Sequence, residues 1–176
     1  TKVDRSLAQT MMDTFLARGF TYVDTAYFYH GQESERVVRD ILTSRYPRDS
    51  YVLADKMPIT SLRDKGTAED QARIFDEQLE KCGVAYFDRY LVHCLNAANY
   101  RAAKRLDTFA FLAGKKEEGK IRHLGFSYHD NAQLLDQILT EHPEVEFVQL
   151  QLNYLDWEDE RIQSRKCYET VVRHGK

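Results

Sequence analysis

Four side chains capable of acid–base chemistry occur at or soon after the ends of short apolar stretches. Asp24 ends the first stretch, Tyr29 follows it by five residues, and Lys56 and His93 come at the ends of two later stretches. The ends of neighbouring parallel strands lie about 5 Å apart, so side chains at successive strand ends can meet at one rim. We therefore expect Asp24, Tyr29, Lys56 and His93 to form a candidate catalytic group.

A phenol beside an ammonium group has a definite chemical use. One unit charge at ~4 Å and an effective dielectric constant of ~20 is worth about 4 kcal/mol, which favours the ionised phenol. Asp24 opposes part of this effect, but it also keeps a buried Lys56 charged and aimed. Tyr29 is then expected to donate a proton near neutral pH, with His93 orienting the substrate oxygen. Three alternatives stay open: Asp24 as a turn cap with Tyr29 as a rim aromatic, His93 as a structural residue, and Lys56 as a Schiff-base lysine.

Composition limits the classes of protein and partner. The chain has 176 residues, 43% of them hydrophobic, and a net charge of −3 from 25 basic and 28 acidic residues that are interspersed along it. This predicts a single domain over residues 1–176 that binds a small molecule, with no nucleic-acid stripe and no membrane segment. The three cysteines and the histidines lack disulfide or metal-ligand spacing, so we expect reduced thiols, no metal and a cytoplasmic protein. The sequence does not begin with Met, so a targeting segment stays possible.

Helical and strand patterns alternate along the chain. Apolar periodicity predicts helices near residues 7–16, 34–42, 67–82, 100–118, 131–139 and 162–172, and strands at 21–24, 51–54, 90–92, 121–126 and 147–152. This alternation predicts an α/β protein with a parallel sheet, either a doubly wound sheet or a (β/α)8 TIM barrel.

Two observations favour the barrel. No G-x-G-x-x-G follows any strand, and the polar residues leave the ends of several successive strands, as they do in barrel enzymes. A barrel of roughly 250 residues uses about 31 residues per unit. The expected fold is an incomplete barrel, with a first helix plus about five βα units, lacking strand 1 and strands 7 and 8. Its open edges require another segment to complete it.

Five segments carry a resemblance to a known family. DTAYFYHGQESE resembles the aldo-keto reductase signature of an Asp, a Tyr five positions later, and then Gly and Glu. Lys56 in LADKMP, His93 in YLVHCL, and the segments GKIRHLGFS and VQLQLNYLDW follow in the family's order and near its spacing. The chain is thus similar to the central portion of an aldo-keto reductase barrel.

The resemblance implies hydride transfer between a nicotinamide cofactor, usually NADP(H) with NAD(H) possible, and an aldehyde, ketone or alcohol. It implies that Tyr29 is the general acid tuned by Lys56 and Asp24, and that His93 orients the carbonyl. Ser127 and Gln149 match the positions that hydrogen-bond the nicotinamide carboxamide, although as plain sequence either is also an ordinary strand-end residue.

Some positions depart from the family pattern. Tyr128 stands where the family often has Asn, and His129 with Asp130 suggests the subgroup in which some members append an iron-sulfur domain, although this segment encodes no cluster. The resemblance implies that the loops contacting the cofactor phosphates follow strands 7 and 8, which we do not expect within residues 1–176. Trp157 is expected either to line the substrate mouth or to pack under its loop. The resemblance also allows a non-catalytic, NADP(H)-binding regulatory subunit, and it favours no oligomeric state.

Overall fold

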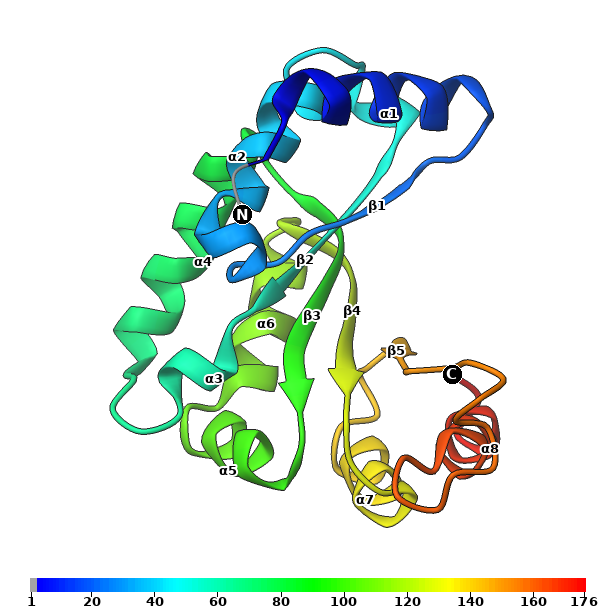
Figure 1. Ribbon diagram of the computed structural model, residues 1–176. Coiled ribbons are helices and arrows are strands. Elements are labelled where there is room, and N and C mark those ends of the chain that lie inside the picture. Colours follow the sequence, from blue (N-terminus) through cyan, green and yellow to red (C-terminus); the bar gives the residue numbers. More distant parts are fainter. Residues whose placement is uncertain (1–2) are drawn as a thin grey trace.

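The computed structural model of the protein describes residues 3–176 (Figure 1). Within this range one sheet contains five strands, all paired in parallel, in the order β1-β2-β3-β4-β5. The strands are β1 (Tyr22–Asp24), β2 (Val52–Met57), β3 (Phe87–Leu95), β4 (Ile121–Tyr128) and β5 (Phe147–Gln149). The strand order follows the chain order, whereas a doubly wound sheet reverses its order at a switch point.

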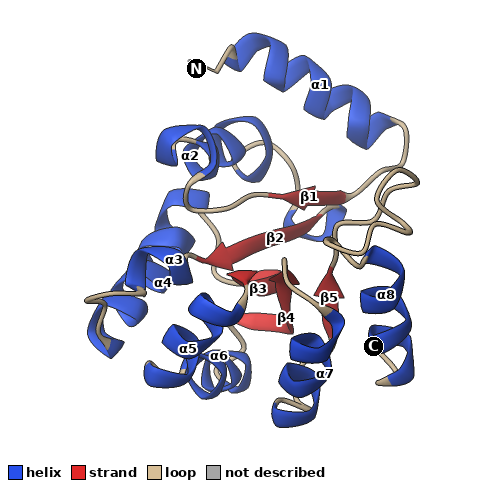
Figure 2. Cartoon of the chain, turned by 60° about the horizontal axis from the view of Figure 1, so that its bottom comes forward, coloured by secondary structure: helices blue, strands red, loops and turns tan. Residues whose placement is uncertain are grey.

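The helices lie around the outside of the curved sheet (Figure 2). They are α1 (Arg5–Ala17), α2 (Ser34–Val38), α3 (Ile59–Leu62), α4 (Ala68–Cys82), α5 (Ala97–Arg105), α6 (Thr108–Glu117), α7 (Ala132–Glu141) and α8 (Ser164–Arg173). Parallel strands with helical crossovers on one side make a curled half-barrel, as expected for part of a (β/α)8 barrel.

Local sequence signals set several helix boundaries. Thr67 and Asp70 form a reciprocal capping box at the start of α4, and Gly83 ends that helix in the left-handed conformation. The Asn131 side chain accepts a hydrogen bond from the backbone N–H of Leu134 and caps α7. These features confirm the predicted start of both helices.

Other boundaries differ from the prediction. The helix expected at 100–118 is two helices, α5 and α6, because Asp107 takes a left-handed conformation with φ of 52° between them. The strands β2, β3 and β4 extend past the expected ends, because a buried strand can carry polar side chains when partners satisfy them. By contrast, β5 stops at Gln149, and α8 begins only at Ser164.

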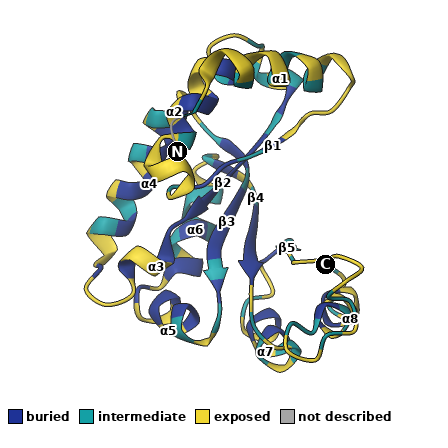
Figure 3. Ribbon diagram, viewed as in Figure 1, coloured by how far each residue is buried: buried dark blue, intermediate teal, exposed yellow. Residues whose placement is uncertain are grey.

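The apolar core lies between the sheet and the helices (Figure 3). Phe75 of α4 packs edge-on against Tyr90 of β3, with ring centroids 5.0 Å apart, and against Phe87 at 6.2 Å. This layer fixes the strands whose ends carry the candidate site. Among residues 3–176, no helix combines the length and apolar character needed to span a bilayer.

Candidate active site

The parallel register brings Asp24 and Lys56 to the same face of the sheet. Asp24 in β1 pairs with Ala54 in β2, and Lys56 stands two residues after Ala54. Side chains two residues apart in a strand point to the same face, so the Asp24 carboxylate and the Lys56 ammonium converge. Asp55, between Ala54 and Lys56, points to the opposite face.

The Lys56 ammonium has three oxygen partners. Its Nζ forms an ion pair with the Asp24 carboxylate and donates to the carbonyl oxygen of Thr25 at 2.9 Å and to the Tyr29 hydroxyl at 3.2 Å. The Lys56 side chain is 1% exposed, whereas that of Asp24 is 27% exposed. Three oxygen acceptors compensate for the burial of this ammonium and hold it in one position.

A tight loop turns Tyr29 back over the end of β1. His30 and Gly31 both have positive φ, 52° and 66°, in the turn that follows Tyr29. The backbone N–H of Tyr29 donates to the carbonyl of Ala26 at 3.0 Å. The phenol is 38% exposed, so it contacts Lys56 with its oxygen and remains accessible to a substrate.

His93 completes the group from β3. Its ring is edge-on to that of Tyr29 with centroids 5.9 Å apart, and it lies 6.5 Å from the ring of Phe28. Burial, with smaller contributions from the charges of Lys56 and His129, lowers the pKa of His93 to about 4. The imidazole is therefore neutral at physiological pH and can offer one N–H donor to a substrate oxygen.

A break in the β3–β4 register follows His93. Cys94 has a φ of 55°, and the pairing shifts between Val92 and Leu95. The Cys94 backbone N–H donates to the Ser127 hydroxyl oxygen at 2.8 Å. His93 lies two residues after Leu91, the register partner of Lys56, and so faces the site by strand alternation, while Cys94 ties this end of β3 to Ser127.

Ser127 and Gln149 are register partners on β4 and β5. Ser127 is buried, whereas Gln149 is exposed and its Nε2 lies 3.4 Å from Oδ2 of Asp24, across the open side of the half-barrel. The structure thus brings Asp24, Tyr29, Lys56 and His93 together, with Gln149 in contact with Asp24 and Ser127 beside Gln149.

Three other residues singled out from the sequence have structural contacts. The Tyr128 hydroxyl donates to the carbonyl of Asn131 at 2.6 Å, and its ring packs on Phe126, on the opposite face of β4 from Ser127. Asp130 accepts from the backbone N–H of Ala97 at 2.8 Å. Trp157 packs on Tyr168 of α8, with centroids 5.8 Å apart, which favours the packing alternative for this side chain.

Sequence reasoning missed two parts of this site. The Thr25 carbonyl is a backbone group, and its role depends on a geometry that no residue type reveals. Phe28 lies beside His93. The sequence feature that could have identified it is its position directly before Tyr29 in the loop.

Comparison with known proteins identifies the family. The sequence model of the aldo/keto reductase family matches residues 1–176. An aldo-keto reductase of Mycolicibacterium smegmatis is 32% identical over 112 residues, which are 64% of this chain and 38% of that protein. The structure of a putative aldo-keto reductase from Pseudomonas aeruginosa superposes with a TM-score of 0.76 at 20% identity, covering 99% of this chain and 64% of that one.

A second solved structure, an aldo-keto reductase from Klebsiella pneumoniae in complex with NADPH, gives a TM-score of 0.66 at 21% identity, over 97% of this chain and 55% of that chain. At these identities the structures demonstrate a shared fold. The chain spans less than two thirds of the length of each of these three relatives. The match of the family model over the whole sequence is what decides the assignment: the chain belongs to the aldo/keto reductase family.

Proposed function

We propose that this chain carries the proton-transfer half of an NADP(H)-dependent carbonyl reductase. The observation that carries the proposal is the 3.2 Å separation between the Tyr29 hydroxyl and the Lys56 Nζ, with Asp24 beside that ammonium. Aldehydes and ketones are the proposed substrates, and oxidation of the corresponding alcohols is the reverse reaction.

In the proposed reaction Tyr29 gives its hydroxyl proton to the substrate oxygen. When bound, NADP(H) supplies the hydride to the carbonyl carbon, so the carbonyl gains one hydride and one proton and becomes an alcohol. The phenolate that Tyr29 becomes is stabilised by the Lys56 ammonium, and solvent returns the proton through the exposed edge of the ring. Asp24 keeps Lys56 charged throughout.

His93 has the role of orienting the substrate. Its low pKa of about 4 keeps it neutral, so it hydrogen-bonds to the carbonyl oxygen without competing with Tyr29 as the acid. The two rings are in edge-on contact with centroids 5.9 Å apart, and we propose that His93 and Tyr29 reach the same substrate oxygen.

Ser127 and Gln149 suit the carboxamide of a nicotinamide ring. The Ser127 oxygen already accepts from Cys94, so its own proton is free to donate to an amide carbonyl. The exposed Gln149 amide offers both a donor and an acceptor at the same level of the sheet. The NADPH held by the Klebsiella pneumoniae relative supports NADP(H) as the cofactor.

The contacts of Lys56 disfavour the Schiff-base reading. An amine that attacks a carbonyl must be unprotonated and exposed, whereas Lys56 is paired with a carboxylate and buried. Borohydride treatment with substrate is therefore expected to leave Lys56 unlabelled. A purely regulatory, NADP(H)-binding role keeps the same contacts and is distinguished by the absence of turnover.

An activity panel tests the proposal. The intact protein is incubated with NADPH and a series of aldehydes, ketones and quinones, and loss of reduced nicotinamide is followed by absorbance. We expect oxidation that depends on the carbonyl compound, with the matching alcohol as product. Binding of NADPH without turnover on any member of the panel would point to the regulatory role.

Two finer assignments stay predictions. Because the structural relatives are longer than this chain, we propose that further segments complete the barrel as strands 1, 7 and 8 and contact the cofactor phosphates. Membership of the subgroup with an iron-sulfur domain rests on His129 and Asp130 alone.

A further inference from the structure

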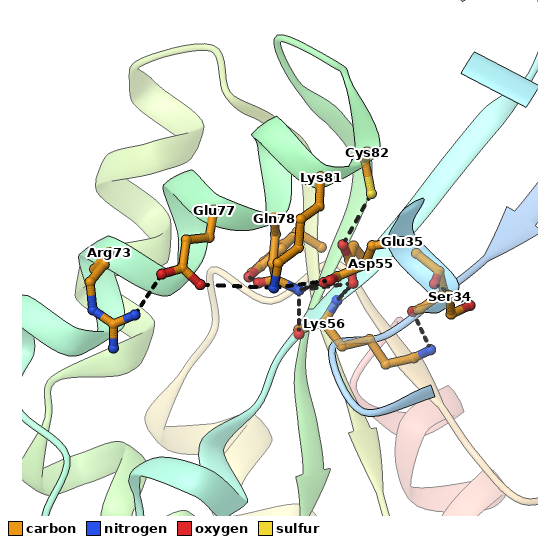
Figure 4. Close-up of polar contacts among 11 residues, drawn as sticks. Ser34, Glu35, Asp55, Lys56, Arg73, Glu77, Gln78, Lys81 and Cys82 are labelled. Atoms are coloured by element: carbon orange, nitrogen blue, oxygen red, sulfur yellow. Dashed lines mark hydrogen bonds and ion pairs between the residues drawn. The ribbon is translucent and has the colours of Figure 1, made fainter. Parts of the chain in front are cut away.

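A second polar cluster lies behind the candidate site, on the other face of β2. Asp55 precedes Lys56 in the strand and therefore points away from it, toward α2 and α4 (Figure 4). There it meets Glu35 of α2 and Gln78 of α4, and all three side chains have 0% exposure. Buried polar groups of this kind are costly unless they are hydrogen-bonded, so their partners matter.

Gln78 bridges the two carboxyl groups. Its Nε2 lies 2.9 Å from Oε1 of Glu35, 3.0 Å from Oδ1 of Asp55 and 3.1 Å from the carbonyl oxygen of Lys56. Its Oε1 accepts from the Tyr90 hydroxyl at 2.5 Å. One amide thus connects α2, α4, β2 and β3.

Lys56 is held from this side through its backbone. Its N–H donates to Oδ1 of Asp55 at 2.8 Å, and its carbonyl oxygen faces Gln78. Glu35 lies six residues after Tyr29, at the point where the Tyr29 loop enters α2. The cluster therefore clamps the Lys56 backbone to the base of the loop that carries Tyr29.

Both carboxyls of the cluster contact the same amide nitrogen, that of Gln78. The titratable groups beside the two carboxyls include Lys81, whose Nζ lies 3.5 Å from Oε2 of Glu35, and Cys82, whose Sγ lies 3.6 Å from Oδ2 of Asp55. Tyr90 bonds to Gln78, and the charges of Lys56 and Arg36 act on Asp55 and Glu35 respectively. Burial, with the charge of Glu35, raises the pKa of Asp55 well above its ordinary value, and burial also raises the pKa of Glu35. Each of these carboxyls therefore favours its neutral form more than an exposed carboxyl does, and Lys81 supplies a positive charge beside Glu35.

We propose that Glu35, Asp55 and Gln78 are positioning residues that fix the separation between the Tyr29 hydroxyl and the Lys56 ammonium. This inference rests on the proposed function, because it assigns the cluster to the reaction of that site. None of the three touches the substrate face. They act through the backbone of Lys56 and through the α2 end of the Tyr29 loop.

The test compares two glutamines of one helix. Gln78→Met removes the bridge, and Gln71→Met is the matched control, since Gln71 is also buried in α4 but bonds to Thr108 at 2.6 Å, away from β2. Both variants are expected to lose similar thermal stability. In the intact protein, Gln78→Met is expected to lower kcat about 10²-fold with the Kd for NADPH within about twofold, because small misplacements of reacting groups are costly. Gln71→Met is expected to keep kcat within about threefold.

Two further variants keep the test decisive. If Gln78→Met yields no folded protein, Glu35→Met cuts the same bridge from α2 and is expected to have the same effect. Asp55→Asn keeps the shape and the oxygen that accepts from Lys56, so its kcat is expected to stay near that of the unmodified protein. A loss in Asp55→Asn as large as that in Gln78→Met would overturn the positioning role in favour of a role for the charge.

A crystal structure of Gln78→Met gives a readout independent of turnover, and the distance from the Tyr29 hydroxyl to Lys56 Nζ is expected to exceed hydrogen-bonding range. An unchanged distance with kcat equal to the Gln71→Met control overturns the inference. If the Gln78→Met result is negative in this way but Tyr29→Phe abolishes turnover, the positioning role of the cluster fails and the proposed function stands. If Tyr29→Phe turns over normally, the proposed function fails instead.

Discussion

Replacing Lys56 with Met removes one charge from the centre of the site while keeping an unbranched side chain of similar length. The lost ammonium lies 3.2 Å from the Tyr29 hydroxyl oxygen, which becomes a phenolate in the proposed reaction. A unit charge at ~4 Å and an effective dielectric constant of ~20 is worth about 4 kcal/mol, and about 1.4 kcal/mol corresponds to a tenfold change in rate. We therefore expect kcat to fall about 10³-fold. The released Asp24 carboxylate, still near the phenol, adds to this loss.

The assay is the steady-state oxidation of NADPH with the best carbonyl substrate, together with fluorescence titration of NADPH binding. Lys115→Met is the matched control, because Lys115 is also mostly buried and paired, with Glu118 at 2.9 Å, but lies on α6 outside the site. Lys56→Met leaves the Asp24 carboxylate without its cation. The double variant Asp24→Asn with Lys56→Met is therefore expected to be more stable than Lys56→Met, with turnover that remains low. A kcat for Lys56→Met within tenfold of that of the control would refute the reasoning.

Three further predictions concern pH, cofactor binding and stability. The pKa of His93 is about 4 in the folded protein and about 6.5 when exposed, so the unfolded chain takes up the proton first as the pH falls. The free energy of unfolding should therefore fall by up to about 3 kcal/mol between about pH 6.5 and pH 4. In urea unfolding, His93→Asn should lose less stability over this pH range by that amount, and an equal loss in both proteins would exclude His93 as the origin. Ser127→Ala should weaken NADPH binding about fivefold, as one hydrogen bond is worth about 1 kcal/mol, and an unchanged Kd by titration would contradict the contact. Asn131→Ala removes the cap of α7 and should lower the free energy of unfolding by about 1 kcal/mol. Denaturant unfolding measures this, with Gln133→Ala, an exposed position of the same helix, as control, and equal effects of the two changes would count against the cap.

The sequence predicted the parts of the fold that depend on local pattern. Alternating helical and strand periodicities gave a parallel sheet, and residues at strand ends indicated where side chains would converge. Asp24 and Lys56 are 32 residues apart, yet their meeting follows from strand alternation and parallel register alone.

What the sequence did not predict depends on tertiary contacts. The prediction that the second strand ends before Asp55 was wrong, because the charged residues Asp55 and Lys56 resemble the exit of a strand. Asp55 is instead buried within β2, where Gln78, 23 residues away, donates a hydrogen bond to it. The break between α5 and α6 at Asp107 lacks the glycine or proline that usually announces one. No periodicity in the sequence identifies Gln78 as the bridge between two carboxyls.

The central claim is that the Tyr29 hydroxyl delivers the proton to a carbonyl oxygen. The most direct measurement is the single-turnover rate of NADPH oxidation in Tyr29→Phe, with enzyme in excess over cofactor and with the NADPH Kd measured in parallel. The account predicts an unchanged Kd and a rate at least about 10²-fold below that of the unmodified protein. A single-turnover rate within a few-fold of that of the unmodified protein would contradict it.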